Sequence, residues 1–151
     1  MPALDRYLHT QARQDVQKNL AVVFILTSDG KTVAGYYTLS QYSVRIDTIP
    51  EEIARKLTKY PEIPATLIGR LAVSSVHRGQ GLGELLVMDA LRRCLSLSGK
   101  AASWAVIVDA KDESGEGFYK RYGFSALPKV PRRWFLTTAT IEKLFPRTAG
   151  R

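Results

Sequence analysis

The sequence has few of the residues that build disulfides, metal centres and membrane spans. It contains one cysteine, Cys94, and two histidines in 151 residues, which excludes an internal disulfide and a cysteine–histidine zinc cluster. No run of about 18 apolar residues occurs, as a transmembrane helix would need. Asp5 and Arg6 stand where a signal peptide needs apolar residues. These absences predict a protein without a bound metal or a membrane anchor, in a reducing, cytoplasmic compartment.

The composition fits one packed domain with a basic surface. Apolar residues make up 45% of the chain, and we expect a single domain over residues 1–151. The net charge is +8 at pH 7, and residues 111–151 hold nine basic and four acidic side chains. Surface lysine and arginine attract polyanions, so the charge favours a nucleic-acid partner. A basic surface that only aids solubility fits the charge equally well.

The hydrophobic periodicity predicts an α/β protein with a mixed sheet and helices on both faces. Helical spacing of apolar residues alternates with short runs of β-branched residues, and glycine or proline separates them. A hairpin stands at the front, and a strand–turn–helix–strand unit follows it. The expected helices are 2–19, 51–58, 84–97, 114–122 and a last turn at 141–145, and the expected strands are 20–27, 32–46, 65–73, 103–108, 124–126 and 134–140.

A glycine-rich turn joins the strand 65–73 to the long helix that follows it. Glycine permits positive φ angles and a close approach of the backbone to a ligand. The first N–H groups of a helix have no partner inside the helix, and the helix dipole strengthens their attraction for an anion. The turn therefore predicts a phosphate or pyrophosphate site. Its residues are Arg78, Gly79, Gln80, Gly81, Leu82 and Gly83.

Three interpretations of this turn compete on sequence grounds. A Walker A loop needs lysine and serine or threonine after its last glycine, and Glu84-Leu85 stand there instead. The Rossmann spacing G-x-G-x-x-G does not match alternating glycines, although Asp109 after the next strand keeps that fold among the alternatives. The third interpretation is a structural turn that binds nothing.

Two motifs resemble those of the GNAT superfamily of N-acetyltransferases. The pattern R-x-x-G-x-G, after a strand that ends Leu-Ala-Val, resembles motif A, which grips the pyrophosphate of acetyl-CoA in that family. Downstream, residues 118–124 (FYKRYGF) resemble the F-Y-x-x-x-G-F of motif B. The resemblance covers essentially the whole chain. It implies a mostly antiparallel sheet whose splayed central strands bind acyl-CoA, with acetyl-CoA as cofactor.

Within that superfamily, the chain is similar to the acetyltransferase toxins of bacterial toxin–antitoxin pairs. The similar stretches are 4–8 (LDRYL), 35–40 (GYYTLS), 70–73 (RLAV) and 133–136 (RWFL). The resemblance implies acetylation of the amino group of aminoacyl-tRNA, which blocks translation. It also implies a homodimer and a cognate antitoxin with a ribbon-helix-helix DNA-binding segment. Such proteins usually carry a strand before the helix at 4–8, so a domain without that first strand is expected.

Acetyl transfer from a thioester to an amine needs alignment, a polarised carbonyl and a protonated leaving thiolate. A backbone N–H on Leu71, Ala72 or Val73 is a candidate to polarise the carbonyl, and the resemblance implies that pantetheine pairs along this strand. Tyr119 matches the motif B tyrosine and is the candidate general acid, because the pKa of a phenol lies near that of an alkyl thiol. Tyr122 is its rival for this role.

Other side chains near the motifs have both a functional and a structural interpretation. Phe118 is assigned to the cofactor site with Tyr119, although both rings suit simple packing as well. Asp109 suits a hydrogen bond to the cofactor or substrate, and equally a helix cap. Cys94, with no histidine near it in sequence, fits a buried structural thiol. Both histidines fit surface or packing roles, so no general base is evident.

Four arginines are candidate contacts to tRNA. Arg92 and Arg93 are expected on the exposed side of the long helix, where they suit the 3′-phosphate of the cofactor, tRNA or simple solvation. Arg132 and Arg133 precede Trp134, and arginine beside an aromatic suits RNA. The functions that stay open are a tRNA-acetylating toxin, an acetyltransferase of a small amine or protein amino group, and a non-catalytic module that binds RNA or a protein.

Overall fold

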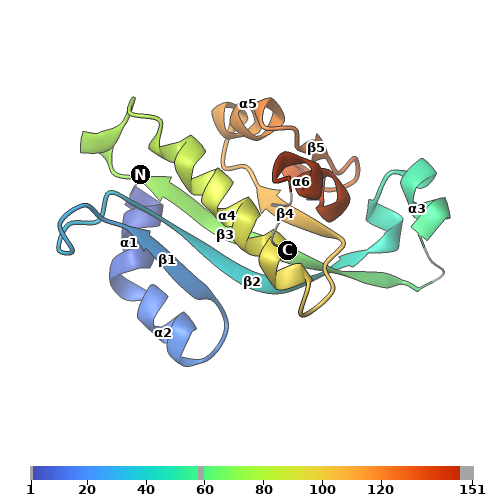
Figure 1. The fold of residues 1–151 in the computed structure, drawn as a ribbon, viewed down its shortest axis with the longest axis horizontal. Coiled ribbons are helices and arrows are strands. Elements are labelled where there is room, and N and C mark those ends of the chain that lie inside the picture. The colour runs from blue at the N-terminus through green and yellow to red at the C-terminus, as the bar shows by residue number, and fades with distance from the viewer. Residues whose placement is uncertain (1, 58–59, 147–151) are drawn as a thin grey trace. The chain divides into compact units, whose positions relative to one another are not determined.

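The computed structural model describes residues 2–57 and 60–146 of the chain. Helices and strands alternate along it, in close agreement with the expected order (Figure 1). The helices are α1 (Pro2–Thr10), α2 (Ala12–Gln17), α3 (Glu51–Leu57), α4 (Leu82–Ser98), α5 (Glu113–Arg121) and α6 (Thr138–Leu144), with short 3₁₀ turns η1 (Ile46–Thr48) and η2 (Ser75–His77). The strands are β1 (Val22–Leu26), β2 (Gly35–Arg45), β3 (Glu62–Val73), β4 (Ala105–Asp109), β5 (Ser125–Ala126) and β6 (Arg133–Thr137).

The six strands form one sheet in the order β1-β2-β3-β4-β6-β5. Strand β1 pairs antiparallel with β2, and β6 pairs antiparallel with both β4 and β5. The prediction of a mixed α/β fold with a mostly antiparallel sheet is confirmed. The splay of the central strands stays a prediction.

The described chain falls into two compact units. The first comprises Met1–Ser40 and Ile68–Leu91, and the second comprises Gln41–Leu67 and Arg92–Arg151. In the first, Tyr7, Ala12 and Tyr36 pack together in a core beneath α1 and α2. In the second, β4 supplies the central core residues, and its Ala105 to Val108 are almost fully buried. That burial explains the continuous apolar run in the sequence of this strand.

The first helix and the first hairpin differ from the prediction. The first helix, expected over 2–19, is interrupted at Gln11, which adopts φ −116° between α1 and α2. Strand β2 begins at Gly35 instead of residue 32. The reason is the carboxylate of Asp29, which accepts hydrogen bonds from the N–H groups of Lys31 and Thr32 at 2.8 and 2.7 Å. This side-chain cap extends the turn at the expense of the strand.

Two strand ends also differ from the prediction. The prediction of a loop over residues 60–64 is wrong for residues 62–64, because β3 already begins at Glu62. Pro64 has no N–H to donate, but its carbonyl accepts the N–H of Trp104 at 2.8 Å, which suffices for pairing at this end of β3. The last strand ends at Thr137 instead of residue 140. The Thr137 hydroxyl caps α6 by accepting the N–H of Thr140 at 3.2 Å.

Candidate active site

The glycine turn between η2 and α4 has an open backbone surface. Gly79 and Gly81 adopt φ +83° and +74°, and a Cβ at either position would meet nothing within 4 Å. Gly83 lies inside the first turn of α4. In the described part of the chain, no protein oxygen accepts a hydrogen bond from the N–H groups of residues 79–83. Free donors at a helix start, with no Cβ atoms over the two turn glycines, fit a pyrophosphate.

The strand that leads to this turn is tightly held against β2. A Cβ on Gly35 would lie 2.9 Å from the carbonyl oxygen of Ala72, so only glycine permits this approach. The N–H of Ser74 donates to the carbonyl of Ala34 at 2.8 Å. Leu71, Ala72 and Val73 are half-buried here. The cofactor residues expected on β3 and on the turn therefore belong to one continuous, fixed segment of the first unit.

A cluster centred on Tyr7 lies at the start of the same segment, and sequence reasoning missed it. The guanidinium of Arg70 lies over the Tyr7 ring, with its carbon 3.8 Å from the ring centroid. The Tyr7 hydroxyl donates to Asp15 at 2.7 Å, and Gln11 donates to the other carboxylate oxygen at 3.1 Å. Burial and then the bond to Asp15 raise the pKa of Tyr7 to about 12. The signal in the sequence was a charged residue, Arg70, inside the mostly apolar run of residues 65–73.

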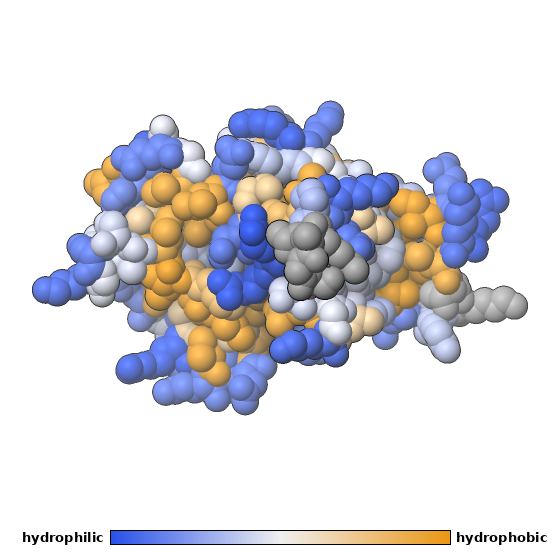
Figure 2. Space-filling model, in the orientation of Figure 1, coloured by the Kyte–Doolittle hydropathy of each residue, from blue (hydrophilic) through white to orange (hydrophobic). Residues whose placement is uncertain are grey.

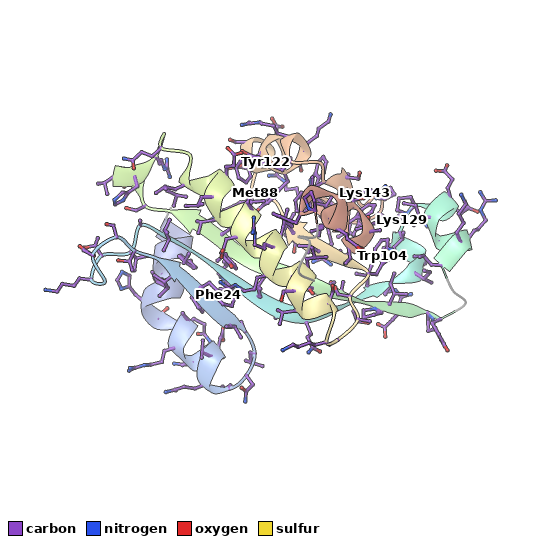
Figure 3. All side chains as sticks on the ribbon, viewed as in Figure 1. Phe24, Met88, Trp104, Tyr122, Lys129 and Lys143 are labelled. Carbon is purple, nitrogen blue, oxygen red and sulfur yellow. The ribbon has the colours of Figure 1, made fainter. Side chains whose placement is uncertain are left out.

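The second unit holds the candidate acid. Tyr119 lies on α5 and is 8% exposed, between the rings of Phe118 and Phe124 at centroid distances of 5.3 and 5.4 Å. Burial and then the negative charge of Asp109 raise the pKa of Tyr119 to about 12, so its phenol stays protonated at neutral pH. Tyr122, labelled in Figure 3, follows α5 and packs edge-on against Phe118 at 5.0 Å.

Asp109, at the end of β4, is held by an arginine and does not cap a helix. The guanidinium of Arg133 donates to its two carboxylate oxygens at 2.7 and 2.8 Å, and also to the Tyr42 hydroxyl. These partners raise the pKa of Arg133 above its ordinary value, with the bond to Asp109 as the largest cause. Asp112 is the residue that caps α5, by accepting the N–H of Gly115 at 2.8 Å. The helix-cap interpretation of Asp109 is therefore wrong.

Arg132 supports the same connection between β4 and α5. It adopts φ +61°, which is uncommon for a residue with a Cβ. Its carbonyl accepts the N–H of Ala110 at 2.8 Å, and its side chain donates to the carbonyl of Lys111 at 2.9 Å. Together with Arg133, it fixes the backbone that leads to the candidate acid. Both arginines therefore have intramolecular partners, and their contact with tRNA stays a prediction.

The remaining candidates lie on α4 and β6. Arg92 is exposed, with its guanidinium carbon 4.8 Å from the centroid of the Phe145 ring, and Arg93 is exposed as expected. Cys94 is 4% exposed, and burial raises the pKa of its thiol to about 12, as a structural thiol requires. Trp134 is only half-buried. The described residues contain no cluster suited to a metal ion, and none of their helices is long and apolar enough to cross a membrane.

Comparison with known proteins finds relatives that match the region containing both motifs. The family model described as the acetyltransferase (GNAT) family matches residues 2–124. A protein of Sinorhizobium fredii described as probable toxin TacT is 32% identical, over 83% of this chain and 74% of its own length. A protein of Mycobacterium tuberculosis described as a tRNA-acetylating toxin is 31% identical, over 86% of this chain and 76% of its own length.

Solved structures agree with the sequence comparison. A tyrosine-to-phenylalanine mutant of KacT superposes with a TM-score of 0.90 at 28% identity, over 96% of this chain and 87% of that one. AtaT complexed with acetyl-methionyl-tRNAfMet superposes with a TM-score of 0.88 at 30% identity, over 97% of this chain and 88% of that one. A related complex, AtaTR, was solved with acetyl-CoA bound, at a TM-score of 0.84 and 30% identity, over 97% of this chain and 87% of that one.

Proposed function

Because this chain belongs to the acetyltransferase (GNAT) family, we propose that it is a toxin that transfers acetyl from acetyl-CoA to the amino group of aminoacyl-tRNA. The proposal that tRNA is the acceptor is supported by the similarity, over more than four fifths of the chain, to a relative described as a tRNA-acetylating toxin. The excess of basic residues agrees with a polyanionic acceptor. N-acetylation blocks the amine that would form the next peptide bond, so translation stops.

The cofactor would be held by main-chain groups. The open N–H groups of residues 79–83 suit its pyrophosphate, and Arg78 beside them is exposed and adds positive charge. Pantetheine would run along Leu71, Ala72 and Val73, with one N–H of this strand polarising the thioester carbonyl. Acetyl-CoA supplies the activated acetyl group.

The acceptor amine attacks the thioester carbonyl carbon, a C–N bond forms, and the C–S bond breaks. Tyr119 donates its phenolic proton to the departing thiolate, since its buried phenol remains protonated at neutral pH. The amine loses one proton to solvent, and the Tyr119 phenolate regains one from solvent, so the products are N-acetyl-aminoacyl-tRNA and free coenzyme A. The α-amino group of an ester is weakly basic, and a water relay serves as base.

The proposed regulation of this protein is based on complexes of similar proteins. The solved AtaT structures include complexes with the antitoxin AtaR and with DNA, and we propose an antitoxin with a ribbon-helix-helix DNA-binding segment for this chain. We also propose a homodimer, since the edge strand β1 exposes Val22 and Ile25, with Leu20 beside it. Figure 2 shows hydrophobic surface where β1 lies in Figure 1. The whole chain would act as one catalytic domain, in the cytoplasm where charged tRNA occurs.

The decisive experiment is incubation of the protein with labelled acetyl-CoA and total charged tRNA. We expect the label on the amino group of one or a few aminoacyl-tRNAs, identified after hydrolysis of the ester. Uncharged tRNA serves as the control and should take up no label. Label on a small amine or a protein, and none on tRNA, would refute the proposed acceptor while leaving the acetyltransferase assignment intact.

A further inference from the structure

Arg70 occupies the acceptor end of the strand that would bind the cofactor. Strand β3 runs toward the glycine turn, where the pyrophosphate would lie. Pantetheine paired with residues 71–73 then extends back from the turn, at about 3.3 Å per residue. Its thioester end therefore lies toward Arg70. A substrate that approaches the acetyl group meets this arginine first, whereas the cofactor's phosphates stay at the opposite end of the segment.

The guanidinium of Arg70 is held in place, and none of the residues that the structure describes accepts a hydrogen bond from it. Its backbone N–H donates to the buried hydroxyl of Thr38 at 3.0 Å, and its side chain lies in van der Waals contact with the Tyr7 ring. Among the described residues, no carboxylate lies within ion-pair distance of Arg70. Asp15 is the nearby acid, and its two oxygens accept from Tyr7 and Gln11 instead.

The aromatic platform under Arg70 is rigid. The Tyr7 ring lies nearly parallel to the ring of Tyr36, with an interplanar angle of 10° and centroids 6.3 Å apart. Its hydroxyl is fixed by Asp15, and the residue is 4% exposed. A planar cation that is stacked on a fixed ring loses little conformational entropy when it binds an anion. An exposed arginine with no described carboxylate within ion-pair distance, set on such a platform, is suited to ligand binding.

The chemistry of the proposed acceptor decides which anion this cation receives. In an aminoacyl ester, the amino acid's carboxyl group is esterified and neutral, and its amino group repels a cation. The nearest negative charge is the phosphodiester on the 5′ side of the terminal nucleoside. We propose that Arg70, stacked on Tyr7, binds this phosphodiester and so places the aminoacyl group at the thioester. This inference rests on the proposed function and names a contact within its acceptor site.

Two small acceptors isolate this contact. The first is aminoacyl-adenosine, which has no phosphodiester, and the second is the aminoacylated dinucleotide CpA, which has one. Both carry the amino acid that the wild-type protein labels in total charged tRNA. We expect the wild type to prefer the dinucleotide roughly 10- to 100-fold in kcat/KM, the range for a hydrogen-bonded charged pair. Arg70→Gln should reduce that preference to about 1, while the KM for acetyl-CoA stays unchanged.

Two further variants separate binding from folding. Arg70→Lys keeps the charge and the aliphatic stem but not the two-pronged geometry, so it should retain only part of the preference. Arg13→Gln removes an exposed cation of α2 and should keep all of it. Thermal unfolding of each variant shows whether the fold persists.

A full preference in folded Arg70→Gln or Arg70→Lys, or equal use of both acceptors by the wild type, would overturn the inference and leave the proposed function standing. A wild type that acetylates neither charged tRNA nor the two small acceptors would overturn both.

Discussion

Replacing Tyr119 with phenylalanine removes one oxygen atom and tests the catalytic proposal directly. The phenol is protonated at neutral pH and would protonate the departing thiolate, a role that typically contributes about 10²- to 10⁴-fold to a rate. The residue is 8% exposed, so neighbouring rings hold its position. We expect Tyr119→Phe to lower kcat by roughly that factor while acetyl-CoA still binds with the same affinity.

The structure makes this substitution unusually informative, because it predicts almost no change in stability. No hydrogen bond to the phenolic oxygen of Tyr119 occurs among the residues that the structure describes. The ring keeps its contacts with Phe118 and Phe124 in the variant. Because no such bond is lost, we expect the free energy of unfolding to change by less than about 1 kcal/mol, the net contribution of one hydrogen bond. A large loss of rate could then not be attributed to a loss of fold.

Three measurements complete the test. Release of free thiol from acetyl-CoA gives kcat, calorimetric titration gives the affinity for acetyl-CoA, and thermal unfolding gives stability. Tyr122→Phe is the matched control, because it removes the same atom from the rival tyrosine, three residues further along the chain. A wild-type rate for Tyr119→Phe, or a loss of activity in Tyr122→Phe instead, would refute the role of Tyr119 as the acid.

Further predictions follow from the other contacts. Burial raises the pKa of Tyr119 most, and the negative charge of Asp109 raises it further. Asp109→Asn removes that charge, so the pH at which kcat falls on the alkaline side should become lower. An unchanged pH profile would contradict this prediction. Arg133→Gln should lower kcat by several-fold at unchanged tRNA affinity, since it breaks a bidentate pair that fixes the approach to α5. A weaker affinity for tRNA together with a shallower salt dependence would instead indicate a direct contact with a phosphate. Gly81→Ala places a Cβ at φ +74° and should cost about 1 kcal/mol of stability and raise the KM for acetyl-CoA. Gly30→Ala has the same strain at φ +76° with open space around it, and should leave that KM unchanged.

The sequence predicts the elements that carry the motifs because their signals are local. The glycines of the turn, the apolar run of β4 and the amphipathic helix α5 each specify their own conformation, and their order matches the expected one. The errors occur where a distant or side-chain partner decides. Pro64 is part of a strand because its carbonyl accepts a hydrogen bond from the N–H of Trp104, forty residues away. The turn at Asp29 is predicted at the right place, but hydrogen bonds to the Asp29 carboxylate make it longer than predicted.

The same division holds within the candidate site. A motif identified Tyr119, but no local pattern could pair Asp109 with Arg133, which lies 24 residues further along the chain. Likewise, Arg70 and Tyr7 meet only because the fold brings the first helix to β3. Sequence reasoning assigned Arg133 to RNA because a basic residue beside tryptophan suits RNA in general. The structure gives its guanidinium three hydrogen bonds inside the protein.

This distinction changes how the net charge of +8 should be interpreted. An arginine whose donors are already bonded within the protein contributes to the long-range field but forms few new bonds with a phosphate. Arg133 is of this kind, and Arg132 partly so, whereas Arg70 combines exposure, a fixed position and unused donors. Affinity for tRNA should therefore depend on salt through the whole basic surface, since each phosphate that is neutralised releases counterions. Correct placement of the aminoacyl end should depend on very few cations, and among the described residues that combine these properties Arg70 is the strongest candidate.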